Sequence, residues 1–189
     1  MAPTTRAMTT TARAMALAAL TQDEQRIIFT QLCNTLDPRV AMAFSSASPE
    51  LWALTQALRQ QLRADYEAAA ALCRKVGLQS CKELREAKKV DWRHKGLSSD
   101  DLATLGTLVL PALEWLVLMD SPGAAGPDGV QRLAEGLGAG ALPAVIWLTL
   151  ESIHVGDAGA SALAAALGRG ALPQLKCLNL TQAAIGDAG

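Results

Sequence analysis

Apolar residues recur at steps of three and four through residues 49–76, which is the spacing of one face of an α-helix. This stripe consists of Leu51, Leu54, Leu58, Leu62, Tyr66, Ala69 and Cys73. Ser48 is suited to the N-cap, Pro49 to the first helical position and Gly77 to the stop. The pattern predicts one uninterrupted helix, about 40 Å long at 1.5 Å per residue.

Two shorter helices are predicted before it. Thr21 and Glu24 form the T-x-x-E pattern of a capping box, and apolar residues then recur as far as Leu36. The Asp37-Pro38 step ends this helix, because proline disfavours helical backbone in the residue before it. The apolar residues of the stretch 40–44 predict a short second helix. The N-terminal region is therefore expected to be all-α.

A different pattern repeats in the second half of the chain. The segments 110–118, 142–150 and 172–180 each begin with Leu-Pro and end in Leu-x-Leu, at spacings of 32 and 30 residues. A turn with glycine at both ends follows each segment, and the second and third turns each begin 30 residues after the one before. Alanine- and leucine-rich stretches follow the first two turns, and a weaker copy of the unit lies around residues 90–105.

Each unit reads as a strand, a turn and a helix. Leu-x-Leu places two leucines on one face of a strand, and Asp128 and Asp157 are suited to cap the helices that follow. One such unit cannot bury its own apolar face, so neighbouring units must stack. The sequence therefore predicts an α/β fold with a parallel sheet, in which the strand of each repeat lies beside its equivalent.

Over residues 84–189 this unit resembles a leucine-rich repeat of the ribonuclease-inhibitor-like class. The resemblance implies a short curved solenoid with a parallel sheet. We expect its last repeat to be incomplete, because the chain stops at Gly189, where the third repeat helix should begin. The pattern departs from the family where Asn or Cys is usual, three residues after Leu-x-Leu. Those positions hold Ser121, Ile153 and Ala183.

The alternation along each strand predicts an exposed concave face. If the repeated leucines point inward, their neighbours form three columns: Trp115, Trp147 and Cys177; Val117, Thr149 and Asn179; Met119, Glu151 and Thr181. Parallel strands lie about 4.8 Å apart, so the two tryptophans should stand side by side. Exposed tryptophans are favoured at the centres of protein interfaces, so this face is the predicted partner-binding site. The alternative is that the two rings only pack on each other or on other parts of the chain.

Residues 20–54 resemble an F-box. The resemblance rests on Leu20-Thr21-Gln22-Asp23-Glu24, an apolar helix, Leu36-Asp37-Pro38-Arg39, a small-residue helix and Trp52. It implies docking to a Skp-type adaptor of a ubiquitin ligase, with the repeats holding the substrate. The implied contact residues are Leu20, Ile27, Ile28, Leu32, Leu36 and Pro38. Thr21 stands where the family has proline, and Cys33-Asn34-Thr35 is an insertion. The alternative is a helical cap that shields the first repeat.

Composition also changes along the chain, near residues 97–110. Residues 110–189 hold 12 of the 15 glycines but only 10 of the 35 charged residues. We expect a flexible or targeting tail at 1–19, a helical region at 20–83 and repeats at 84–189. The net charge of −1 argues against a nucleic-acid or membrane-surface partner, and no apolar run reaches the roughly 18 residues of a membrane span. The expected partner is a protein, with no nucleic acid and no membrane.

Residues that could carry chemistry are few. The two histidines, His94 and His154, belong to no recognisable nucleophile–base arrangement. The four cysteines have neither zinc-site nor disulfide-framework spacing, which favours free thiols in a reducing compartment. We therefore expect no enzyme activity, no cofactor and no metal. The predicted location is the cytoplasm, with the nucleus or an organelle as alternatives.

The sequence thus predicts a non-catalytic protein–protein interaction module that binds its partner on the concave strand face. An F-box-type substrate receptor of a ubiquitin ligase is one alternative. GTPase activation, which some similar repeat proteins perform, is another, but it needs an exposed arginine poised at a nucleotide. Arg132 and Arg169 lie in or near the predicted helices rather than on that face.

Overall fold

The computed structural model describes residues 19–119 and 125–187, which hold eight α-helices and four β-strands. The chain divides into two compact units, an N-terminal unit through Tyr66 and a C-terminal unit from Glu67. The division falls inside helix α5 (Gln56–Val76), whereas the sequence predicts a boundary between the helical region at 20–83 and the repeats at 84–189. The predicted tail lies outside the described residues except for Ala19. Among the described helices, none combines the length and apolar character needed to cross a membrane.

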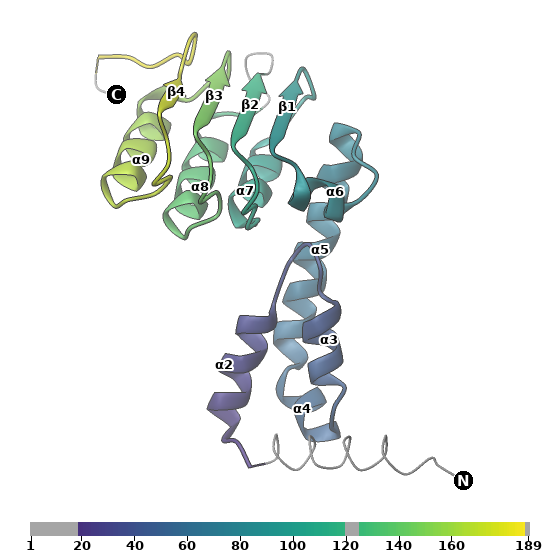
Figure 1. Cartoon of the computed structure of the whole chain (residues 1–189). Helices are drawn as coiled ribbons and strands as arrows, with labels where there is room; N and C mark the ends of the chain where they lie inside the picture. The colour runs from purple at the N-terminus through teal and green to yellow at the C-terminus, as the bar shows by residue number, and fades with distance from the viewer. Residues whose placement is uncertain (1–18, 120–124, 188–189) are drawn as a thin grey trace. The chain divides into compact units, whose positions relative to one another are not determined.

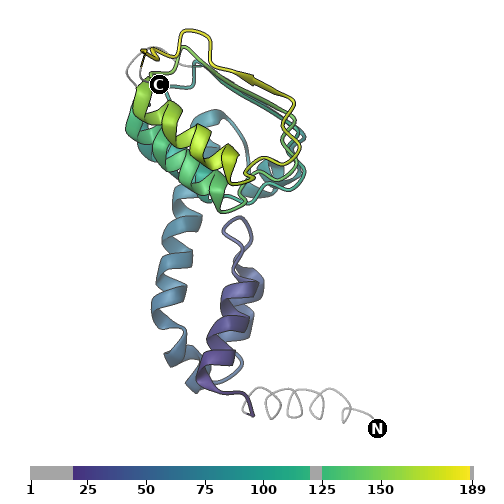
Figure 2. The same cartoon turned by 90° about the vertical axis from the view of Figure 1, so that its left-hand side faces the viewer.

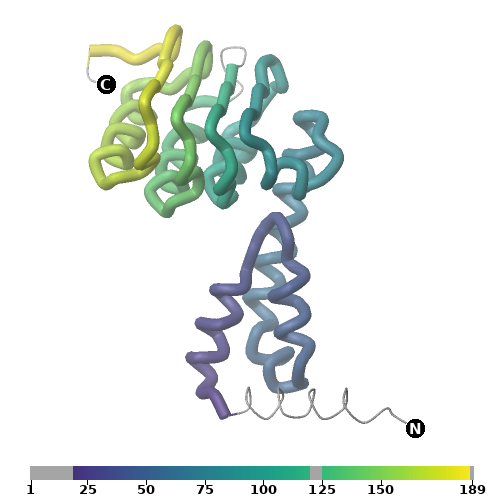
Figure 3. Tube along the Cα trace, in the orientation of Figure 1, coloured from purple at the N-terminus to yellow at the C-terminus, as the bar shows by residue number. Residues whose placement is uncertain are grey.

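The N-terminal unit contains α2 (Gln22–Leu32), α3 (Arg39–Ser45), α4 (Pro49–Leu54) and the first part of α5 (Figure 3). The predicted capping box is present: the Thr21 hydroxyl accepts from the Glu24 N–H, and the Glu24 carboxylate accepts from the Thr21 N–H. The predicted short helix forms as α3. These helices share a small apolar core of Phe29, Ala41 and Leu62, with Leu32, Cys33, Phe44 and Leu58 packed against it.

The prediction of one unbroken helix from residue 49 is wrong, because the helix divides at Thr55 into α4 and α5. Thr55 is fully buried, and its hydroxyl donates to the Leu51 carbonyl at 2.7 Å. The Arg59 guanidinium donates to the Trp52 carbonyl, also at 2.7 Å. Side-chain donors therefore bond to carbonyls in the last turn of α4, and such back-bonding bends helices. The period of the apolar stripe continues across the break and does not reveal it.

The C-terminal unit is mixed α/β. After α5 come α6 (Cys81–Glu86), β1 (Lys89–Arg93), α7 (Ser99–Thr107), β2 (Trp115–Met119), α8 (Pro127–Gly138), β3 (Trp147–Glu151), α9 (Gly156–Gly168) and β4 (Cys177–Asn179). The four strands form one open parallel sheet in the order β1-β2-β3-β4. Helices α7, α8 and α9 stack side by side in a second layer along the sheet (Figures 1 and 2). The prediction of an α/β arrangement with a parallel sheet is confirmed.

The repeat sets the register of the sheet. Leu116 pairs with Leu148 and Leu148 with Leu178, so equivalent positions of the repeats lie side by side. The Leu-x-Leu residues of β2 and β3 are buried, whereas Leu178 and Leu180 at the open edge are only partly so. The weaker upstream copy forms β1, in which Val90 and Trp92 are buried. Ile153 and Ala183 are buried at the positions that depart from the family pattern.

Glycine lets the neighbouring helices α7 and α8 approach closely. A Cβ placed on Gly136 of α8 would lie 2.0 Å from the carbonyl oxygen of Gly106 in α7. One on Gly129 would lie 2.8 Å from the Cα of Ser99. Both distances are well below van der Waals contact, so the backbones meet where only glycine fits.

The predicted N-caps Asp128 and Asp157 are not caps. The residues at the cap positions of α8 and α9 are Gly126 and Val155, and neither forms a side-chain cap. Both aspartates instead stand in the first helical turn, where the helix dipole favours an anion. The Asp157 carboxylate accepts the N–H of Gly186 at 2.6 Å, so it links its own repeat to the turn of the next one.

Candidate protein-binding face of the sheet

The strand register brings the predicted columns together on one face of the sheet. Trp115 pairs with Trp147 and then Cys177, Val117 pairs with Thr149 and then Asn179, and Met119 pairs with Glu151. Thr181 lies beyond β4, but its carbonyl accepts the N–H of Ser152. This bond places Thr181 beside Glu151, so it continues the third column. We call this surface the strand face.

Sequence reasoning missed the contribution of β1 to the strand face. Lys89 pairs with Trp115, Asp91 with Val117 and Arg93 with Met119, so each column gains one charged residue. The signal was present in the alternation of Lys89–Arg93, where Val90 and Trp92 occupy the buried positions. The repeat copy that contains β1 lacks the Leu-Pro start of the other copies, so the repeat pattern alone does not mark Lys89–Arg93 as a strand.

The two tryptophans form a stack. Their ring centroids are 5.1 Å apart and their planes differ by 2°, so the indoles lie parallel across adjacent strands. Trp115 is 40% exposed and Trp147 is 37% exposed. The expectation that they stand side by side is confirmed, and each retains a substantial free surface beyond the contact with the other.

The middle column is less open than expected. Val117 and Thr149 are buried, so neither offers a side chain at the surface of the strand face. At Thr149, the indole two residues earlier on the same face contacts the side chain. The Trp147 Nε1–H donates to the Thr149 hydroxyl at 3.1 Å, which holds the ring against that side chain. Trp115 precedes Val117 by the same two residues. Asn179, at the open edge, stays half-buried.

The charges around the tryptophan stack are not all paired. Lys88 forms an ion pair with Glu114 at 3.6 Å, and Arg93 forms one with Asp91 at 3.1 Å. Lys89 instead lies with its Nζ 5.9 Å from the centroid of the Trp115 ring, within reach of a cation–π interaction. Within the described ranges, Lys89 has no carboxylate partner. The stack therefore has an uncompensated positive charge at its β1 side.

Most of the predicted adaptor-binding residues are half-buried or buried. Ile27 on α2 is 61% exposed. Leu36 is buried, and Leu32 packs against the core of the N-terminal unit. Leu20, Ile28 and Pro38 are half-buried. Ile27 is the most exposed residue of the implied contact set, and Leu32, on the same helix, turns toward the core.

Groups with potential chemistry are dispersed. All four cysteines are free, and among the described residues no group of three or more His, Cys, Asp or Glu side chains could hold a metal ion. Burial raises the pKa of the Cys73 thiol to about 12, and the charge of neighbouring Cys81 adds to this effect. Arg132, considered above for GTPase activation, forms an ion pair with Asp100 at 3.0 Å.

Comparison with known proteins does not assign the chain to a family. No protein-family model matches it, and no curated protein and no solved structure is significantly similar to it.

Proposed function

We propose that this protein is a leucine-rich-repeat solenoid of the ribonuclease-inhibitor-like class that acts as a non-catalytic protein–protein interaction module. The repeat pattern and the in-register parallel sheet support the solenoid. The observation that carries the function is the exposed stack of Trp115 and Trp147 on the strand face. Rigid aromatic side chains held in one orientation lose little entropy on binding, which makes them effective anchors.

The charges around the stack specify the partner's chemistry. Lys89 stands beside Trp115 without a carboxylate partner, so the complementary segment carries an acidic residue. The indoles require an apolar side chain next to that residue. We therefore propose as the occupant a protein segment that places an apolar side chain on the tryptophan stack and a carboxylate near Lys89.

The exposed indole surface sets the size of the effect. A tryptophan presents at most roughly 250 Å², so two-fifths exposure leaves about 100 Å² per ring. At about 25 cal/mol/Å², burying this area contributes about 2.5 kcal/mol per ring before entropy costs. Replacing both rings by alanine should therefore weaken binding on the order of 100-fold or more.

The test is affinity capture with the full chain, followed by binding measurements between the purified chain and each captured protein. Trp115→Ala/Trp147→Ala should weaken the interaction on the order of 100-fold or more, and Lys89→Glu should weaken it and reduce its salt dependence. Val109→Ala is the control, because this residue is 60% exposed in the same unit but lies outside the strands. An affinity of the double tryptophan variant equal to that of the wild-type chain would overturn the proposal.

The N-terminal unit favours a second candidate, an F-box-type substrate receptor of a ubiquitin ligase. The supporting observation is that Ile27 on α2 and Val40 on α3 expose most of their side chains, although both are large and apolar. Co-expression with a Skp-type adaptor should give a complex that Ile27→Asp disrupts. No co-purification of the wild-type chain with the adaptor would remove this candidate and leave the strand-face proposal intact.

A further inference from the structure

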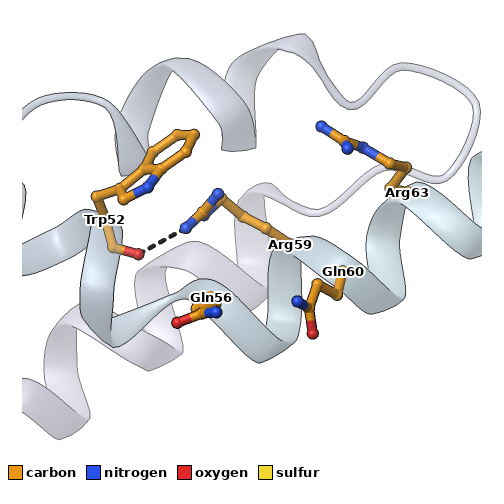
Figure 4. A pocket seen from close by; sticks show the side chains of 5 residues that line it. All are labelled: Trp52, Gln56, Arg59, Gln60 and Arg63. Carbon is orange, nitrogen blue, oxygen red and sulfur yellow. Dashed lines mark hydrogen bonds between the residues drawn. The ribbon is translucent and has the colours of Figure 1, made fainter.

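A cationic pocket lies in the N-terminal unit, outside the elements used so far. Trp52, Gln56, Arg59, Gln60 and Arg63 line a cavity of about 330 Å³. Trp52 comes from α4, and the other four recur at helical spacing along one face of α5. Figure 4 shows the Arg63 side chain extending toward the Arg59 guanidinium, with the Trp52 ring on the far side of Arg59. We call this site the Trp52–Arg63 pocket.

Arg59 is held in place by its surroundings. Its Nη2 donates to the Trp52 carbonyl at 2.7 Å, and its Nε donates to the Thr55 hydroxyl at 3.3 Å. Its guanidinium carbon lies 3.3 Å from the centroid of the Trp52 ring, a close cation–π contact. Two of the five guanidinium N–H groups are used in these bonds, so three remain for a ligand. The fork is therefore oriented in advance, which lowers the entropy cost of binding an anion.

The pocket carries positive charge without internal compensation. Arg26 and Arg39, the other described arginines of this unit, form ion pairs with Asp23 and Asp37. No carboxylate of the described residues lies within ion-pair distance of Arg59 or Arg63. The remaining lining side chains, Gln56 and Gln60, are neutral amides that can donate hydrogen bonds. A ligand of charge −2 would match the two guanidinium charges, because no acid stands in the lining.

We propose that the Trp52–Arg63 pocket binds a dianionic phosphoryl group. A phosphoryl dianion neutralises both guanidinium groups and has three terminal oxygens for two guanidinium forks and one glutamine amide. A single carboxylate would compensate only one of the two charges. The phosphoryl group can come from free phosphate or from a phosphorylated side chain. This site is independent of the strand-face proposal, which concerns the other unit.

The test is titration of the full chain at pH 7.5 with inorganic phosphate, with a short peptide carrying one phosphoserine, and with acetate as a monoanion. Heat release and the shift of the Trp52 indole N–H signal are the readouts, with the signal assigned from a Trp52→Phe spectrum. Phosphate or the phosphopeptide should bind and acetate should not. Binding of both phosphates with equal affinity would identify free phosphate as sufficient, whereas binding of the phosphopeptide alone would identify a polypeptide ligand.

Arginine variants decide whether the pocket is responsible. Arg63→Gln should weaken phosphoryl binding about tenfold or more, because a charge-assisted fork is lost. This residue is exposed and has no partner among the described residues, so its loss should not disturb folding. Arg26→Gln is the matched control on α2 and should leave the affinity unchanged. Unaltered binding in Arg63→Gln, binding of acetate as strong as that of phosphate, or no binding of either phosphate ligand would overturn the proposal.

Discussion

Changing Gly136 to alanine should destabilise the C-terminal unit strongly, against the usual effect of alanine in a helix. Alanine at an interior helix position stabilises by about 1 kcal/mol relative to glycine. At Gly136, however, the new Cβ would lie 2.0 Å from the carbonyl oxygen, 2.3 Å from the carbonyl carbon and 2.6 Å from the Cα of Gly106. All three are backbone atoms of α7, so no side-chain rotation relieves the clash. The two helices must separate by more than about 1 Å before the new Cβ lies near 3.4 Å from the Gly106 carbonyl oxygen, which is an ordinary van der Waals distance.

Overpacking of this kind costs about 1–3 kcal/mol, and the backbone location of the clash places Gly136→Ala at the upper end. We expect a loss of about 3 kcal/mol in the free energy of unfolding and a fall in Tm on the order of 10 °C. Gly138→Ala in the same helix is the matched control, because the nearest atom to its new Cβ is the mobile end of Arg169 at 3.6 Å. This control should be neutral or slightly stabilising. Urea unfolding followed by circular dichroism measures both variants, and equal stability of the two would refute the close approach of α7 and α8.

Two further predictions concern ionisable groups of the C-terminal unit. Burial raises the pKa of the Asp101 carboxyl, but hydrogen bonds from Lys75 and Ser98 outweigh this effect, so the pKa lies below its ordinary value. Ionised Asp101 therefore stabilises the fold above about pH 4, and this contribution is lost as the pH falls through the lowered pKa. The difference in the free energy of unfolding between wild type and Asp101→Asn should therefore shrink on acidification. Urea unfolding between about pH 2 and 6 measures this difference, and a constant difference would contradict the prediction. Cys73 is buried and its thiol has a pKa of about 12, so it should resist alkylation at pH 8 while half-buried Cys177 reacts. Mass spectrometry of the native protein measures the order of modification. Modification of Cys73 before Cys177 would contradict the prediction.

Local signals in the sequence predicted the starts of α2 and α4, whereas the caps predicted for α8 and α9 were wrong. Thr21 and Ser48 each accept a backbone N–H three residues ahead, at the beginnings of α2 and α4. Such caps depend on neighbours within one turn, so the sequence contains all the information needed. The break at Thr55 was not predicted, because it depends on the burial of that side chain and on the Arg59 guanidinium reaching back to Trp52.

The sequence alone determined which residues of β2, β3 and β4 share the strand face. Repeats of nearly equal length place equivalent positions side by side in a parallel sheet, so the pairing of Trp115 with Trp147 followed from spacing alone. Only the tertiary structure decided which of those residues are exposed. Val117 and Thr149 are buried on the same face as the half-open indoles, and Lys89 joins them from β1. The physical reason is that alternation along a strand sets the side to which a residue points, whereas its exposure depends on the size and lean of neighbours on adjacent strands.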